Sequence, residues 1–209
     1  MLHKETVSDT LFKTAQQLAT IPELKLFRMV GGTAIALQLG HRKSIDIDLF
    51  SNDAVNKSLI ANIIKSTFQS EIVVTEHSIQ AEIRGIKIEW YDGWSTPFRH
   101  DALEQEGIRL ASLHDLAAFK INAITGRREK KDYIDLFLLF QQLGPHNVLR
   151  DFSNYEPLLS PKSILFALTE VTTAYENKSV MPEMLVPVNW NDIHKAMIDA
   201  AQWYISFQK

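Results

Sequence analysis

The sequence contains no cysteine among its 209 residues. This absence excludes a disulfide scaffold, a zinc site built on thiolates and a cysteine nucleophile. Long apolar runs are also missing, because the longest, such as Leu136 to Phe140, have five residues, whereas about 20 are needed to cross a bilayer. The amino-terminal segment MLHKETVSD is polar and lacks the apolar core of a signal peptide. We therefore expect a soluble, cytoplasmic protein with no membrane partner.

The composition is that of a globular protein without an excess of basic charge. Apolar residues make up 45% of the chain, which is enough to bury a core in one or two domains. The 22 Lys and Arg side chains face 25 Asp and Glu side chains, giving a net charge of -3. This balance argues against a globally basic nucleic-acid binder, while a local basic patch stays open.

The periodicity of apolar residues predicts two different halves. Alternating patterns typical of strands cover residues 24–30, 45–50, 72–75, 80–84 and 86–91. Helical spacing with caps covers residues 8–21, 33–39, a segment from a cap at Asp53 to residue 68, 112–125, 129–143, 161–175, and a last helix from Asn189 or Asn191 to 207. The sequence therefore predicts an α+β amino-terminal half with a small mixed or antiparallel sheet, residues 1–110, followed by an α-helical half, residues 111–209.

The segment VGGTAIAL, which starts at Val30, runs from a strand through two glycines into a helix. Gly31 and Gly32 let the backbone turn sharply and bring its N–H groups close to a ligand, and the start of the helix after Thr33 favours an anion. An ordinary strand-to-helix turn is the alternative interpretation of so short a glycine motif.

Asp46 and Asp48 stand two residues apart in a strand pattern, so both side chains project from one face. Two carboxylates on one face can share a hard divalent cation such as Mg²⁺. The alternative is an exposed polar face of an edge strand, where two acids repel only mildly. The glycine turn directly before this pair favours the first interpretation, since it places an anion cradle beside a metal-binding pair.

Two groups of motifs resemble one family. The first is Gly-Gly-Thr-Ala from Gly31, followed by His41-Arg42-x-Ser44-x-Asp46-x-Asp48-Leu-Phe. The second is Lys120, then Arg127, then Lys131-Asp132-x-x-Asp135. Together, over about residues 28–140, they resemble the nucleotidyltransferase AbiEii/AbiGii toxin family of the polymerase-β-like nucleotidyltransferase superfamily.

The resemblance implies the nucleotidyltransferase fold, a helical domain that closes a cleft, and transfer of a nucleoside monophosphate from an NTP with Mg²⁺ or Mn²⁺. Under it, the phosphate-binding turn is Gly31, Gly32 and Thr33, and the metal ligands are Asp46, Asp48 and a third acid. Glu89 is the best candidate for that third acid because it lies opposite Ile88 and Trp90 in the strand alternation, and Asp92 is its competitor. Lys120 would reach the triphosphate, and Asp132 or Asp135, here assigned as Asp135, would complete a later acidic motif.

Several of these residues have a second interpretation from the residues alone. Lys120 interrupts the apolar stripe of its helix, so it either snorkels to solvent or points into a cleft. Asp132 and Asp135 lie near a helix start, where acids favour the dipole in any case. Arg42, beside Ser44 at the mouth of the expected cleft, binds a phosphate or pairs with an acid. The basic run Arg127 to Lys131 is a solvated turn or contacts an RNA backbone.

The resemblance also suggests an RNA acceptor, such as a tRNA 3′ end, and a toxin of a toxin–antitoxin or abortive-infection system with a cognate antitoxin as partner. Two rivals remain on the same fold: a catalytically silent nucleotide-binding protein and a protein-interaction module. A phosphatase of the D-x-D-x-T type is disfavoured, because Leu49 and Phe50 follow Asp48 without the threonine.

Overall fold

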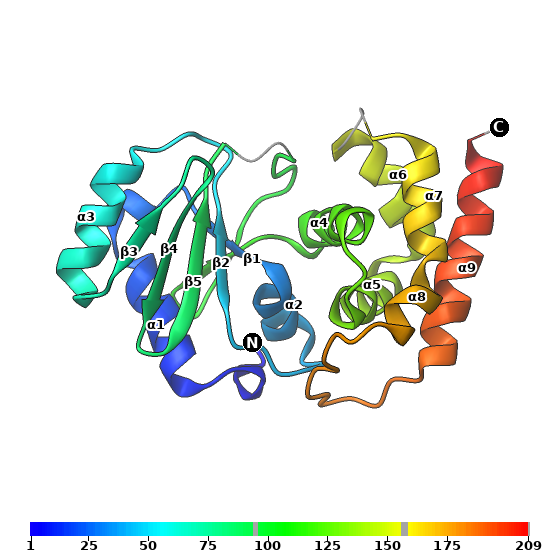
Figure 1. Cartoon of the computed structure of the whole chain (residues 1–209), viewed down its shortest axis with the longest axis horizontal. Coiled ribbons are helices and arrows are strands. Elements are labelled where there is room, and N and C mark those ends of the chain that lie inside the picture. Colours follow the sequence, from blue (N-terminus) through cyan, green and yellow to red (C-terminus); the bar gives the residue numbers. More distant parts are fainter. Residues whose placement is uncertain (94–95, 156–158, 209) are drawn as a thin grey trace. The chain divides into compact units, whose positions relative to one another are not determined.

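The computed structural model describes residues 1–93, 96–155 and 159–208. The chain divides into two compact units, Met1–Ser112 and Leu113–Lys209. The first contains a mixed β-sheet with helices, and the second is helical (Figure 1). The structure confirms the predicted class, an α+β amino-terminal half followed by an α-helical half. In the described parts of the chain, no helix is long and apolar enough to cross a membrane.

The sheet of the first unit has seven strands in the order β3-β4-β5-β2-β1-β7-β6. Their bounds are Arg28–Val30 (β1), Ile47–Phe50 (β2), Ile72–Val74 (β3), Ser78–Ile83 (β4), Ile86–Tyr91 (β5), Leu103–Gln105 (β6) and Ile108–Leu110 (β7). The pairs β2–β5 and β1–β7 are parallel, and the other pairs are antiparallel. The sheet is therefore mixed, with β1 and β2 near its middle.

Helices cover both faces of this sheet. Figure 1 shows α1 (Asp9–Ala19) and α3 (Lys57–Phe68) on one side and α2 (Gly31–Leu39) on the other. Short 3-10 helices at Lys4–Thr6 and Pro22–Leu24 flank α1. Buried apolar residues alternate with more exposed residues along β2 and β5. Ile47, Ile88 and Trp90, on the buried face, are at most 1% exposed. The apolar side chains of β2 and β5 thus pack on the face opposite to the acidic side chains of these two strands.

In the described residues of the second unit, six helices pack around an apolar core. They are α4 (Leu113–Gly126), α5 (Lys130–Leu143), α6 (Pro145–Tyr155), α7 (Pro161–Thr169), α8 (Val171–Glu176) and α9 (Trp190–Phe207). Ile121, Leu136 and Met197 are fully buried between them. The Tyr133 hydroxyl donates a hydrogen bond of 2.6 Å to the Ala167 carbonyl oxygen, and burial raises the pKa of Tyr133.

The strand expected at 45–50 begins only at Ile47, so Asp46 lies just before β2. Ile45, expected on the buried face, is 75% exposed, because residues 43–46 carry no strand pairing. The strand expected at 24–30 shortens to β1, since Pro22–Leu24 forms a 3-10 helix instead.

Other boundaries also differ from the predicted ones. Asn56, not Asp53, caps α3, and its side chain accepts the Leu59 N–H. The helix expected over 161–175 breaks at Glu170 into α7 and α8. β6, β7 and α6 were not predicted, because the two strands have three residues each and α6 starts within two residues of the end of α5.

Candidate active site

The turn between β1 and α2 brings the backbone against a carboxylate. Gly31 begins α2 with a φ of +69°, a conformation that L side chains rarely adopt. A Cβ on Gly31 would lie 2.2 Å from Oδ2 of Asp48. The residue before it, Val30, is the N-cap of α2 and offers no side-chain acceptor to the first-turn N–H groups. The start of α2 therefore suits an anion, and only glycine at position 31 lets Asp48 approach it.

Asp48 and Glu89 lie side by side on neighbouring strands. β2 and β5 are parallel, with Asp48 in register with Glu89. Residues in register on parallel strands point to the same face, and the strands are about 4.8 Å apart. Both side chains are half-buried, whereas Leu49 and Trp90 point into the core on the other face. The fold thus places the residue predicted as the third carboxylate next to Asp48.

Asp46 is positioned through its backbone. Its carbonyl oxygen accepts a hydrogen bond of 2.5 Å from the Thr33 hydroxyl, which also lies 2.8 Å from the Ser44 hydroxyl. Thr33 is 2% exposed. Within the described residues, no hydrogen bond or ion pair engages the Asp46 carboxylate. Thr33 and Ser44 therefore tie the segment before β2 to α2, and the phosphate-binding role of Thr33 stays a prediction.

The two candidates for the third carboxylate have different surroundings. Glu89 accepts a hydrogen bond of 3.1 Å from the Tyr91 hydroxyl, and its other oxygen lies 3.2 Å from Nζ of Lys87. Asp92 is 2.6 Å from Nζ of Lys57, and its side chain is 5% exposed. These contacts link Asp92 to the start of α3. They therefore favour Glu89 as the candidate for the third carboxylate.

The pKa of Asp92 is consistent with this structural role. Burial of the carboxyl opposes its ionisation, but the Lys57 ammonium and the Val55 N–H, which donates to Oδ2 at 3.0 Å, outweigh burial and hold the pKa of Asp92 below its ordinary value. Asp92 is therefore an anion that ties two segments together.

Arg42, predicted at the mouth of the site, is 4% exposed. Its Nη1 donates a hydrogen bond of 2.9 Å to the Lys43 carbonyl oxygen. The guanidinium is thus held close to the backbone of its own segment. Its phosphate-binding role stays a prediction.

The chemistry of these oxygen donors fits a divalent cation that arrives with its substrate. Across the described residues, no three His, Asp or Glu side chains gather closely enough to form a complete protein metal site. Mg²⁺ at nucleotide sites is commonly held by one or two carboxylates, with substrate phosphates and water completing its shell. Asp46 and Asp48, beside a helix start that suits phosphate, are compatible with that mode of binding and not with a protein-only cage.

A cavity of about 420 Å³ lies on the opposite face of β2. Its lining includes Leu18 of α1 together with Ile47 and Leu49 of β2. Since Ile47 and Leu49 alternate with Asp48 along β2, the cavity lies on the face opposite to the Asp48 carboxylate.

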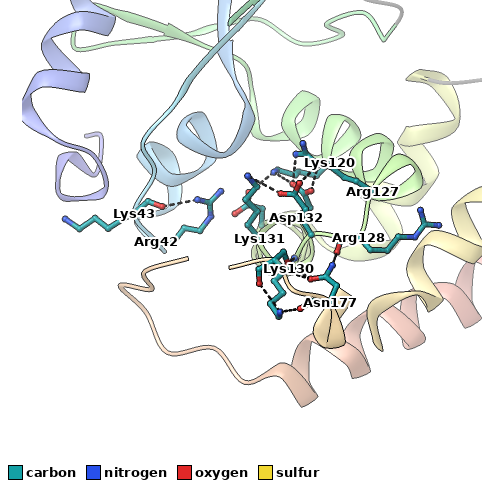
Figure 2. A network of polar contacts seen from close by, with 12 residues as sticks. Arg42, Lys43, Lys120, Arg127, Arg128, Lys130, Lys131, Asp132 and Asn177 are labelled. Atoms are coloured by element: carbon teal, nitrogen blue, oxygen red, sulfur yellow. Dashed lines mark hydrogen bonds and ion pairs between the residues drawn. The ribbon is translucent and has the colours of Figure 1, made fainter. Parts of the chain in front are cut away.

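In the helical unit, Lys120 sits in a buried ionic cluster (Figure 2). Its Nζ lies 2.7 Å from Oδ1 of Asp132 and 2.8 Å from Oδ2 of Asp135. Lys120 is 5% exposed and both aspartates are fully buried. Arg127 adds a bond of 2.7 Å from Nε to Oδ2 of Asp132. Lys120 therefore does not snorkel to solvent, and it joins α4 to α5.

The cluster holds Asp132 as an anion. Burial opposes ionisation of this carboxyl, but the Lys120 and Arg127 cations outweigh burial and lower the pKa of Asp132. Removing one member of such a cluster would leave a buried charge without compensation. Asp132 and Asp135 thus form the ion pairs that stabilise the buried Lys120 ammonium.

The remaining cations of the basic run are also engaged within the helical unit. Nζ of Lys130 donates to the carbonyl oxygens of Asn177 and Ser179 at 2.6 and 3.0 Å, as Figure 2 shows for Asn177. The other two contacts are Arg128 with Glu170 at 3.8 Å and Lys131 with Glu129 at 3.1 Å. These pairs make the run more than a solvated turn, because they connect it to α7 and to the segment after α8.

Comparison with known proteins agrees with the motifs. Residues 15–98 match the family model of the nucleotidyl transferase AbiEii toxin, Type IV TA system. This match confirms the resemblance that the Gly31 turn and the Asp46–Asp48 pair carry. An uncharacterized protein from Aquifex aeolicus (strain VF5) is 29% identical over 127 residues, which span 56% of this chain and 59% of that protein. The chain therefore matches little more than half the length of that relative.

Two solved structures share the fold. A Helicobacter pylori protein assigned as a nucleotidyltransferase superimposes with a TM-score of 0.55 at 16% identity, covering 97% of this chain and 92% of that one. The antibiotic-resistance factor ANT(2'')-Ia gives a TM-score of 0.56 at 19% identity, covering 72% of this chain and 94% of its own. The fold is that of nucleotidyltransferases, as predicted.

Replacing Gly31 by alanine should damage the candidate site more than the fold. The new Cβ would collide with Asp48 and would require a left-handed backbone conformation. We expect loss of nucleotide binding, measured by calorimetry, together with a lower melting temperature. Gly85→Ala is the control, because Gly85 also has a positive φ but no atom lies within 4 Å of the added Cβ. Equal loss of nucleotide binding in both variants would contradict the role of Gly31.

Replacing Lys120 by methionine should destabilise the helical unit by about 3–5 kcal/mol, because Asp132 and Asp135 would stay buried with less compensation. The double variant Lys120→Met/Asp135→Leu should recover part of this loss in urea unfolding. Lys195→Met is the matched control, since Lys195 makes an exposed pair with Asp199 and such pairs contribute at most about 1 kcal/mol. A cost for Lys120→Met no larger than for Lys195→Met would refute the structural role.

The lowered pKa of Asp132 also predicts a pH dependence. A carboxyl whose pKa is depressed by folding stabilises the protein above its unfolded pKa of about 3.9, and this contribution is lost as the pH falls through the folded pKa. The unfolding free energy should therefore fall less steeply below about pH 4 in Asp132→Asn than in the wild type. Asp199→Asn, at an exposed pair, should keep the wild-type slope.

Proposed function

We propose that this chain, whose residues 15–98 match the AbiEii nucleotidyl transferase family, transfers a nucleoside monophosphate from an NTP to an acceptor hydroxyl. The observation that carries the proposal is the convergence of three features on one face: the glycine turn at Gly31, the Asp48 carboxylate against it, and Glu89 in register beside Asp48. A phosphate-binding turn next to carboxylates is the arrangement that a metal-dependent transfer requires.

In this proposal, the N–H groups of Gly31, Gly32 and Thr33 at the start of α2 bind the outer phosphates of the NTP. Asp46 and Asp48 would hold the divalent cation together with the phosphates of the NTP, and Glu89, in register beside Asp48, is the proposed third carboxylate. Such cations, when bound, activate the acceptor hydroxyl and offset the charge that develops on the transferred and leaving phosphates. Thr33 and Ser44 keep the backbone of the Asp46 segment against α2, which would help to position Asp46 near the glycine turn.

Two roles stay predictions: that Lys120 binds the triphosphate, and that Lys120 and Asp135 take part in catalysis. The Lys120 ammonium is shared by two carboxylates, so a phosphate oxygen would have to replace one of them or join them. Arg42 and Ser44 likewise stay predicted contacts to the nucleotide. Asp132 also bonds to Arg127, so it links Lys120 to a second cation.

The acceptor and the biological role are finer parts of the proposal. The matching family is described as a toxin of a type IV toxin–antitoxin system, and this supports a toxin with a cognate antitoxin as partner. RNA, including a tRNA 3′ end, is the proposed acceptor because its terminal ribose carries the hydroxyl that the reaction needs. The rival is a protein on the same fold that binds nucleotide without turnover.

The Asp48→Asn variant tests the proposal. Wild-type protein incubated with α-labelled NTPs, Mg²⁺ and total RNA should transfer label to RNA, and Asp48→Asn should do so at least ~100-fold more slowly because one metal-holding charge is lost. Glu82→Gln is the control, since Glu82 is an exposed carboxylate on β4, which β5 separates from β2. NTP binding without transfer by the wild type would favour the silent rival, and equal transfer by Asp48→Asn would refute the catalytic assignment.

A further inference from the structure

The helical unit has a concave surface between α8 and the start of α9. In the sequence, this surface is distant from the ionic cluster of Lys120, Asp132 and Asp135. Its volume is about 600 Å³. The described residues that line it are Thr172, Tyr175, Val188, Asn189, Trp190, Asn191 and His194. No residue of this set has a role in the proposed transfer.

Two aromatic rings form one wall of this pocket. The ring centroids of Tyr175 and Trp190 lie 5.2 Å apart with an angle of 32° between the planes. Tyr175 is 55% exposed, although it is a large ring on a short helix. An exposed ring supported by a second ring is suited to stack a further planar group on its free face.

The indole of Trp190 packs against the ring of Tyr175 and makes no hydrogen bond to the described residues. Its Nε1–H is buried and has no hydrogen-bond partner among the described residues. Indole N–H groups usually find an acceptor when they are buried, because leaving one without a partner costs stability. In the part of the chain that the structure describes, the Trp190 indole N–H is thus a buried donor without a partner beside the ring of Tyr175.

The rest of the pocket is polar and carries no negative charge. Asn189 caps α9, with its Oδ1 accepting the Asn191 N–H at 2.9 Å. Asn191 and His194 are exposed, and within the described residues no hydrogen bond or ion pair engages their side chains. None of the described lining residues is Asp or Glu. The pocket thus combines a stacking surface with neutral donors and acceptors.

We propose that this pocket binds one unstacked nucleobase. A base has a planar face that stacks on aromatic rings and an uncharged edge that exchanges hydrogen bonds with amides and imidazole. An apolar helix of a protein partner is a poorer fit, since Thr172, Asn189, Asn191 and His194 make up more than half of the lining. The inference rests on the proposed function for its biological meaning, as the base would belong to the RNA acceptor or to a nucleotide.

Binding of a short fluorescent adenylate oligoribonucleotide, measured by anisotropy at fixed salt, tests the pocket. Tyr175→Ala should weaken binding about tenfold, the loss that corresponds to one base–aromatic stack. Tyr175→Phe keeps the ring and should bind like the wild type. An oligonucleotide of the same length without bases should bind more weakly, and equally to wild type and Tyr175→Ala. The melting temperatures of both variants confirm that each is folded.

Competition then separates the two sources of the base. Displacement by AMP as well as by unlabelled oligonucleotide assigns the pocket to the base of a free nucleotide, and displacement by the oligonucleotide alone assigns it to an RNA strand. Either result supports the pocket. Equal affinity of wild type and Tyr175→Ala for the adenylate oligonucleotide overturns it.

The same assay distinguishes this inference from the proposed function. Oligonucleotide binding reports on the pocket and label transfer reports on the proposed function, so the two readouts are compared in the same proteins. Suppose that the wild type transfers no label and that Tyr175→Ala still weakens oligonucleotide binding. This result would refute the proposed transfer and support the pocket. Transfer that depends on Asp48, with binding independent of Tyr175, would refute the pocket alone.

Discussion

The parallel pairing of β2 with β5 is the constraint on which the carboxylate site depends. It sets Asp48 in register with Glu89, while the antiparallel pairing with β1 sets Val30 opposite Asp48 and brings the Gly31 turn to the same place. A shift of one residue in either register would turn these side chains to the opposite face. The apolar partners Leu49 and Trp90 resist such a shift, because they would leave the core. Core packing thus fixes the geometry of the acidic face.

The helical unit shows a different use of charge. Lys120, Asp132 and Asp135 are buried together, which is costly in isolation and tolerable only because each charge has a partner. Such a cluster specifies how α4 and α5 meet more sharply than apolar contacts would. It also means that loss of activity in a Lys120 variant has two physical explanations, a missing phosphate contact or a disrupted helix pair. Stability measurements on the Asp135 double variant separate them.

Charge and aromatic placement together describe what the protein can bind. A net charge of -3 gives no general attraction for RNA, and several cations of the basic run are engaged in pairs within the helical unit. Recognition of an acceptor would then depend on local contacts. The Tyr175–Trp190 wall offers one that needs no positive charge, since stacking acts through the face of a base. Weak electrostatics and a specific stacking contact would favour a particular end or loop over long RNA.

The sequence by itself determined the α+β and helical halves, most strands of the sheet, the glycine turn and the Asp46–Asp48 pair, because these depend on local periodicity and spacing. It also pointed to Glu89 through the alternation of Ile88 and Trp90. Only the tertiary structure showed that Glu89 lies in register with Asp48 and that Asp92 pairs with Lys57, since these are contacts between distant segments. The contacts of Thr33, Lys120 and Trp190 were likewise visible only in the tertiary structure. Their partners lie on other elements, and no local pattern records which polar groups folding will bring together.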